Sequence, residues 1–228
     1  MKTHDSFLRV LDQVERGLRK MRDQAEATRW FYENGNRQAA YERSMTLEEL
    51  SERTVLLTRA LPVYSGLPMA PAAVEDMLSL CITVEIGFTV ENWFCIRIPA
   101  LLPKKGSGSA DYIRSFLYPA MRDFFMNRGS VRYNDCVLIY RHVYDTARPE
   151  RQRRDHDNIE INMVSDIVAM YVMPDDGPAV CSHYYCSASG SEDRTEVYVV
   201  PREAFPIWLV TEKAMPQEGV TLYEERLL

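Results

Sequence analysis

The sequence predicts an α+β fold class: a mixed β-sheet with packed helices, plus an N-terminal helical extension. Three observations support this prediction. Residues 1–60 carry apolar side chains at helical spacing, residues 80–200 alternate between β-branched strands and helices, and a proline-rich segment at 62–71 separates the two parts. We therefore divide the chain into a helical hairpin extension (1–70), an α+β domain (77–200) and a C-terminal tail (201–228).

The N-terminal extension is predicted to contain two helices. The first has apolar residues three and four positions apart, at Phe7, Val10, Leu11, Val14, Leu18 and Met21. The Asn-Gly-Asn sequence at 34–36 predicts the end of this helix. Thr46 and Glu49 match a capping box, which predicts that the second helix begins there.

The domain that follows is predicted to have the order β-β-α-β-α-β-β. Residues 81–90 are rich in β-branched side chains and turn at residues 91–92 into a second strand. A helix is expected from Ser109 or Asp111 to Phe125, and Pro119 should kink or restart it. The remaining predicted elements are a strand at 136–144, a helix at 158–172 and strands at 180–187 and 196–200.

Composition limits the possible functions. The net charge is −6 and the isoelectric point is near 5.4, which argues against non-specific wrapping of nucleic acid and confines any DNA contact to one face. The five cysteines form no CxxC pair, so we expect buried free thiols in a reducing, cytoplasmic environment. No apolar run approaches the roughly 20 residues of a membrane span, so no membrane partner is expected.

One cluster of charged residues makes a specific chemical proposal. Residues 153–158 read Arg-Arg-Asp-His-Asp-Asn, and Asp175 and Asp176 follow after a helix-length gap. Carboxylates beside guanidinium groups suit a divalent metal that acts on a phosphodiester. Taken separately, Asp155 and Asp157 could cap a helix and residues 175–178 could form a turn. The combination favours a site, because the carboxylates converge if the next strand returns beside the first.

With Asp166 and the strand near Val180, this motif resembles the signature of RusA-type Holliday junction resolvases. The preceding order of strand, Lys/Gly/Ser loop, helix and strand is also similar, so the resemblance covers residues 80–200. It implies that Asp155, Asp157 and Asp176 bind Mg²⁺ or Mn²⁺, which would activate water for cleavage. Asp175 could be the ligand in place of Asp176. It also implies a homodimer acting on a four-way DNA junction.

Basic residues near the motif are candidate DNA contacts. They are Arg148, Arg151, Arg153, Arg154, Lys104 and Lys105. Such residues neutralise phosphates without reading sequence, although the arginine run could equally be a solvated loop. The family places a lysine four residues after the second aspartate, where this chain has Ile161. Residues 99–103 also match the family's Pro-Pro-Ser-Asn-Asn loop poorly.

Three functional hypotheses follow from these features. The first is a divalent-metal-dependent endonuclease that cuts branched DNA. The second is a catalytically impaired, nuclease-derived module that binds DNA or a protein, which the loss of the lysine at residue 161 favours. The third is a structural interaction protein whose N-terminal helices mediate assembly and whose aspartates cap a helix. His156, between the two aspartates, is expected to be a bystander.

Overall fold

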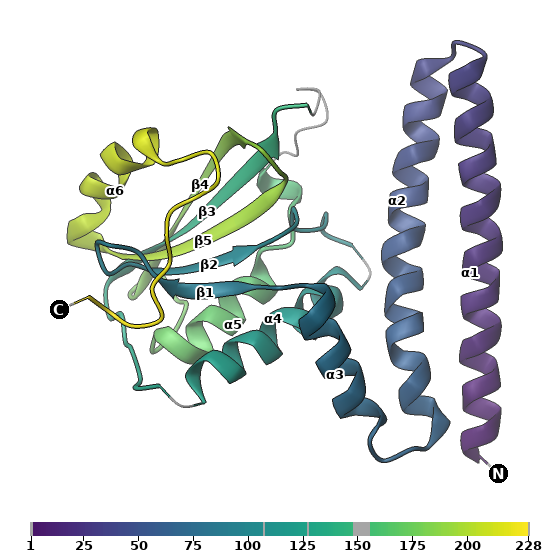
Figure 1. Cartoon of the computed structure of the whole chain (residues 1–228), viewed down its shortest axis with the longest axis horizontal. Coiled ribbons are helices and arrows are strands. Elements are labelled where there is room, and N and C mark those ends of the chain that lie inside the picture. The colour runs from purple at the N-terminus through teal and green to yellow at the C-terminus, as the bar shows by residue number, and fades with distance from the viewer. Residues whose placement is uncertain (1, 107, 127, 148–155, 228) are drawn as a thin grey trace. The chain divides into compact units, whose positions relative to one another are not determined.

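The computed structural model describes residues 2–106, 108–126, 128–147 and 156–227, without the side chains of residues 2–5, 79, 80 and 157. The chain divides into two units. The first comprises residues 1–77 and 107–112, and the second comprises residues 78–106 and 113–228. The first is helical, and the second contains the β-sheet (Figure 1).

The first unit is built on an antiparallel pair of long helices. The helices α1 (Lys2–Glu33) and α2 (Arg37–Ala60) lie side by side (Figure 1). Asn36 caps α2, because its side-chain oxygen accepts a hydrogen bond from the Ala39 N–H at 3.1 Å. The predicted stop at residues 34–36 is therefore confirmed. The 3₁₀ helix η1 (Leu61–Ser65) follows, and α3 (Ala70–Cys81) leads into the second unit.

The predicted helix start at Thr46 is wrong. Thr46 lies inside α2, and its hydroxyl donates a hydrogen bond to the Glu42 carbonyl at 3.2 Å. A threonine in a helix can bond to the carbonyl of the preceding turn, so the Thr-x-x-Glu pattern here does not mark a terminus. The helices approach closely at Gly17, where an added Cβ would lie 2.6 Å from the Thr54 hydroxyl oxygen.

The second unit contains a five-stranded mixed sheet with the order β1-β2-β5-β3-β4. Its strands are β1 (Glu85–Phe88), β2 (Phe94–Ile98), β3 (Cys136–Asp145), β4 (Cys181–Gly190) and β5 (Arg194–Pro201). Neighbouring strands are antiparallel, except that β3 and β4 are parallel. The predicted α+β fold and its mixed sheet are confirmed.

Helices cover both faces of the sheet (Figure 1). The helices α4 (Ser109–Phe125) and α5 (Asn162–Val172) lie on one face, and α6 (Phe205–Thr211) lies on the other. Phe94 of β2 packs against Phe124 of α4, with ring centroids 6.1 Å apart. On the other face, the fully buried Trp208 of α6 packs with Cys95 and Tyr198. The parallel pair β3–β4 is joined across the first face by α5, as a crossover connection requires.

Several predicted boundaries shift. Cys81 ends α3, so the first strand is shorter than residues 81–90. Pro119 lies within the single helix α4 and does not restart it. The predicted helix at 158–172 is preceded by the 3₁₀ turn η3 (His156–Asn158) and begins at Asn162. The tail contains the short helices η4 (Arg202–Ala204) and η5 (Glu212–Ala214) beside α6, and its Tyr223 pairs with Phe88 of β1.

All five cysteines are free thiols, as expected, but the expectation that they are buried holds only in part. Cys95, Cys136 and Cys181 are buried, Cys186 is partly buried and Cys81 is exposed. Among the described residues, no helix combines the length and the apolar character that crossing a membrane would need.

Candidate active site

The predicted motif lies on the connection that carries the chain from β3 across α5 to β4. Because β3 and β4 are parallel neighbours, the chain leaves the end of β3 and re-enters the sheet at the start of β4, beside the start of β3. The turn η3 and residues 175–176 therefore lie toward opposite ends of this strand pair, and the convergence that the sequence argument requires is not seen for the described residues. The four arginines at 148, 151, 153 and 154, and Asp155, lie outside the described residues. Asp157 is described only in its backbone, as the middle residue of η3.

His156 attaches η3 to the far half of β4. Its Nε2 lies 3.4 Å from the Ser187 hydroxyl oxygen, and its ring centroid lies 5.9 Å from that of Tyr185. The ring of His142 on β3 lies 5.5 Å away. The imidazole thus packs against neighbouring rings and a hydroxyl, and its role as a bystander stays a prediction.

Asp175 and Asp176 precede the first residue of β4. Asp175 is exposed and Asp176 is half-buried. The pKa of Asp166 on α5 is raised by desolvation and then by the nearby charges of Asp176 and Glu160. Asp176 also helps to raise the pKa of His183, although a hydrogen bond with the Cys181 thiol is the main cause. Negative charge therefore accumulates along the exposed side of α5.

The described parts of the motif lie at different points along β4. Asp176 lies five residues before Cys181, the first residue of β4, whereas His156 contacts Ser187, six residues after Cys181. Six residues of a strand span about 20 Å. Within the described ranges, no three His, Cys, Asp or Glu side chains come close enough together to hold a metal ion. A metal site therefore depends on the carboxylates of Asp155 and Asp157.

The loop after β2 brings two lysines to the Asp-x-Asp-Asn segment. The Lys105 N–H donates to the Asn158 carbonyl at 2.8 Å, and the Glu160 N–H donates to the Pro103 carbonyl at 2.9 Å. Lys104 and Ile159 form an isolated antiparallel bridge between these two bonds. Both lysines are exposed. The sequence predicts that both lysines contact DNA, but no local sequence pattern predicts that they lie next to residue 157.

Ile161, at the position where the resembled family has a lysine, is buried. Its side chain is 7% exposed, and its carbonyl accepts hydrogen bonds from the Ser165 hydroxyl at 3.2 Å and the Tyr140 hydroxyl at 3.3 Å. Tyr140 and Ser165 are also hydrogen-bonded to each other at 2.8 Å. The Ile161 carbonyl thus connects the start of α5 to β3, and the apolar Ile161 side chain offers no polar group to a ligand.

A buried ionic network, which was not predicted from the sequence, lies on the face of the sheet that α6 covers. Glu196 of β5 is fully buried and accepts hydrogen bonds from Arg141 at 2.8 Å, Arg194 at 2.7 Å and the Tyr198 hydroxyl at 2.8 Å. Arg141 and Glu196 are direct cross-strand partners. The alternation Arg-x-Glu-x-Tyr at 194–198 places all three on one face of a strand and is the signal that could have found it. Burial makes this network a structural element and not a substrate site.

Comparison with known proteins yields one family. The model of the Family of unknown function (DUF6100) matches residues 2–226, which is nearly the whole chain. Neither the curated proteins nor the solved structures include a significant match.

Proposed function

The chain belongs to that family of unknown function, so its function is argued from its own residues. We propose that it is a divalent-metal-dependent endonuclease resembling RusA-type resolvases. Its substrate would be branched DNA, a four-way junction in the first instance. Asp155, Asp157 and Asp176 would hold Mg²⁺ or Mn²⁺, with Asp175 as the alternative to Asp176. The free cysteines suit a cytoplasmic enzyme. Two such sites in a homodimer would face opposing strands of the junction.

The observation that carries this proposal is the pairing of the lysine loop with the aspartate segment. Backbone hydrogen bonds hold Lys104 and Lys105 beside residues 158–160, next to Asp157. Ammonium groups bind phosphate, and carboxylates bind the metal that acts on it, so a phosphodiester needs both within one site. Two segments about 50 residues apart in the sequence supply these complementary groups. If the aspartates only capped a helix, the lysine loop and the aspartate segment would not need to lie side by side.

The acidic residues near α5 place negative charge around this helix, although within the described ranges no three of them are close enough to hold a metal ion by themselves. The pKa of Asp166 is raised by burial and by the charges of Asp176 and Glu160, so the carboxylates repel one another. A hard cation with oxygen ligands would relieve this repulsion. When bound, the metal would lower the pKa of a water molecule and stabilise charge on the phosphate. The lysines at 104 and 105 would hold the DNA backbone.

Cleavage of a synthetic four-way junction tests the proposal. Wild-type protein should nick the junction with Mg²⁺ or Mn²⁺, and Asp157→Asn should lower the rate by at least 100-fold. Asp123→Asn is the matched control, because Asp123 is an exposed carboxylate on α4 that pairs with Arg122. If neither metal supports nicking that Asp157→Asn abolishes, the enzymatic proposal is wrong.

The burial of Ile161 favours a second candidate, a nuclease-derived module that binds junctions or a protein partner without cutting. A lysine at the corresponding family position can contact phosphate, whereas the 7% exposed Ile161 cannot. This module predicts junction binding that weakens with salt and shows no metal-dependent nicking. The same junction, measured for binding and for cleavage, separates the two candidates.

A further inference from the structure

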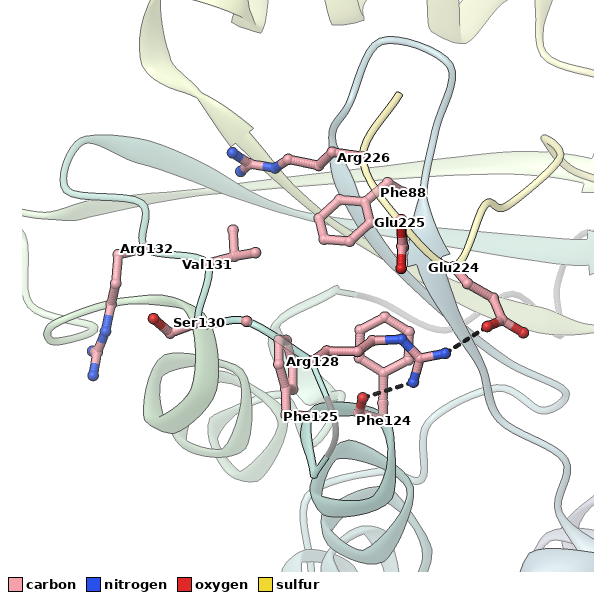
Figure 2. A pocket seen from close by; sticks show the side chains of 11 residues that line it. Phe88, Phe124, Phe125, Arg128, Ser130, Val131, Arg132, Glu224, Glu225 and Arg226 are labelled. Carbon is pink, nitrogen blue, oxygen red and sulfur yellow. Dashed lines mark hydrogen bonds and ion pairs between the residues drawn. The ribbon is translucent and has the colours of Figure 1, made fainter. Parts of the chain in front are cut away.

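A pocket of about 430 Å³ lies in the second unit, and Figure 2 shows the side chains that line it. Its walls come from Phe88 at the end of β1, the end of α4, the loop at 128–132 and the tail at 224–226. This volume is within the range of small-ligand sites. No function assigned above uses this pocket.

Three arginines line the pocket, and two of them are not paired with a carboxylate in the described ranges. Arg128 is neutralised by Glu224 at 2.6 Å and also donates to the Phe124 carbonyl at 2.8 Å. Arg132 donates to the Met173 carbonyl at 2.5 Å, which leaves its charge unbalanced. The guanidinium of Arg226 lies over aromatic rings and contacts no acidic side chain among the described residues.

Aromatic rings hold the guanidinium groups in place. Arg226 lies 5.5 Å from the Phe88 ring centroid and 5.2 Å from that of Tyr133. Arg128 lies 4.3 Å from the Phe124 ring centroid. Phe88 and Phe124 are 3% and 9% exposed, so a ligand would meet the guanidinium groups before the rings. A stacked guanidinium keeps its N–H edge available for an anion, and its plane can accept a flat group.

We propose that this pocket binds a nucleotide unit, with its phosphate on Arg226 and its planar base against the guanidinium groups that are stacked on the phenyl rings. The three arginines outweigh Glu224 and Glu225, so the pocket attracts anions although the whole chain carries a net charge of −6. The nucleotide can be free or part of a single strand. In the second case the inference deepens the proposed nuclease function, because Arg132 contacts Met173 just before Asp175 and Asp176.

Fluorescence anisotropy with a 5′-phosphorylated oligothymidylate tests this site in EDTA, so that no cleavage is required. Arg226→Ala should weaken binding at least tenfold, and Arg226→Lys should weaken it less. Glu225→Gln should tighten binding, since it removes the repelling carboxylate. The matched control is Arg114→Ala, an exposed arginine on the same helix that Arg128 follows, about 20 Å away along its axis. Unchanged circular dichroism of each variant confirms folding.

Competition distinguishes the sources of the ligand. Thymidine monophosphate that competes as well as the oligonucleotide would indicate a free-nucleotide site, and a much weaker effect would indicate a strand-binding site. Equal competition by inorganic phosphate would overturn the assignment to a nucleotide. Equal losses in Arg226→Ala and Arg114→Ala would overturn the pocket itself. The Asp157→Asn variant should bind normally, so failure of the nuclease proposal leaves this test intact.

Discussion

Replacing Glu196 with glutamine tests whether the buried ionic network supports the fold of the second unit. Glu196 is fully buried and accepts three hydrogen bonds of 2.7–2.8 Å, from Arg141, Arg194 and Tyr198. Both arginines are themselves about 5% exposed. Glutamine keeps the shape of the side chain, but it removes the negative charge and turns one acceptor into a donor. The substitution therefore removes the carboxylate nearest to both buried guanidinium groups and leaves Arg141 with the more distant Glu212, at 4.0 Å.

The expected cost is large. Hydrogen bonds to charged partners are each worth roughly 1.5–3 kcal/mol, but their sum overstates the loss because the amide oxygen still accepts. Removing one partner of a buried ion pair costs about 3–5 kcal/mol, and we expect Glu196→Gln to fall in this range. For a chain of this size, roughly 2–4 °C of melting temperature corresponds to each kcal/mol. The predicted decrease in Tm is therefore about 6–20 °C.

Thermal and urea unfolding, followed by tryptophan fluorescence, measure this loss. Trp93 and Trp208 are buried in the same face of the sheet as the network and report on its unfolding. Tyr198→Phe removes one hydrogen bond and should cost about 1 kcal/mol. Glu49→Gln, which breaks an exposed helix pair with Arg53, should change stability by less than about 1 kcal/mol. A Glu196→Gln protein as stable as the Glu49→Gln control would refute the reasoning.

The network also predicts a dependence on pH. Burial alone would raise the pKa of Glu196, but the charge of Arg141 and hydrogen bonds from Arg194 and Tyr198 outweigh it and lower the pKa below 4.5. A carboxyl group whose pKa is lower in the folded state than in the unfolded state stabilises the protein at pH values above its unfolded-state pKa. This stabilisation is lost as the pH falls through the folded-state pKa. Wild-type protein should therefore lose stability more steeply than Glu196→Gln below about pH 4.5.

Two further predictions concern the candidate active site. Ile161→Lys should destabilise the protein by roughly 3 kcal/mol, because it places an unpaired ammonium at a 7% exposed position, whereas Ile161→Val should cost about 1 kcal/mol. An Ile161→Lys protein of normal stability in urea unfolding would contradict the buried placement. The double substitution Lys104→Glu with Lys105→Glu should weaken junction binding at least tenfold at low salt and flatten its salt dependence, with little effect on Tm. Unchanged binding would remove the lysine loop from the proposed interface.

The order of elements in the second unit could be predicted because local patterns specify it. β-branched apolar runs identified the strands, and apolar residues at helical spacing identified α4 and α5, in the order that the structure has. The helices α3 and α6 were not predicted. Boundaries were less accessible. Thr46 and Glu49 form a capping pattern inside a helix, and the apolar residues near Cys81 suit either a helix end or a strand. Tertiary context decides such cases, because short sequence windows are compatible with both structures.

The candidate site was predictable only where its parts are adjacent in sequence. The aspartates and the arginine run stand out as a motif, but the pairing of Lys105 with Asn158 depends on how the β2–α4 loop meets η3. That contact is non-local and has no sequence signature. The partners of Glu196 come from two strands, and only the members on β5 share a local alternation. The burial of Glu196 and its pairing with Arg141 therefore became visible only in the structure.

The lysine loop offers a physical answer to the missing lysine of the motif. In the resembled family that cation comes from the helix after the second aspartate, whereas here Ile161 is packed against β3. Lys104 and Lys105 approach the same segment from another loop, held by the backbone bonds of Lys105 and Glu160. Under the proposed function, Lys104 and Lys105 would supply from this loop the cation that the resembled family places at the position of Ile161. If the loop takes this role, loss of Lys104 and Lys105 should abolish nicking as well as binding. If the chain is a non-cleaving module, their loss should weaken binding alone.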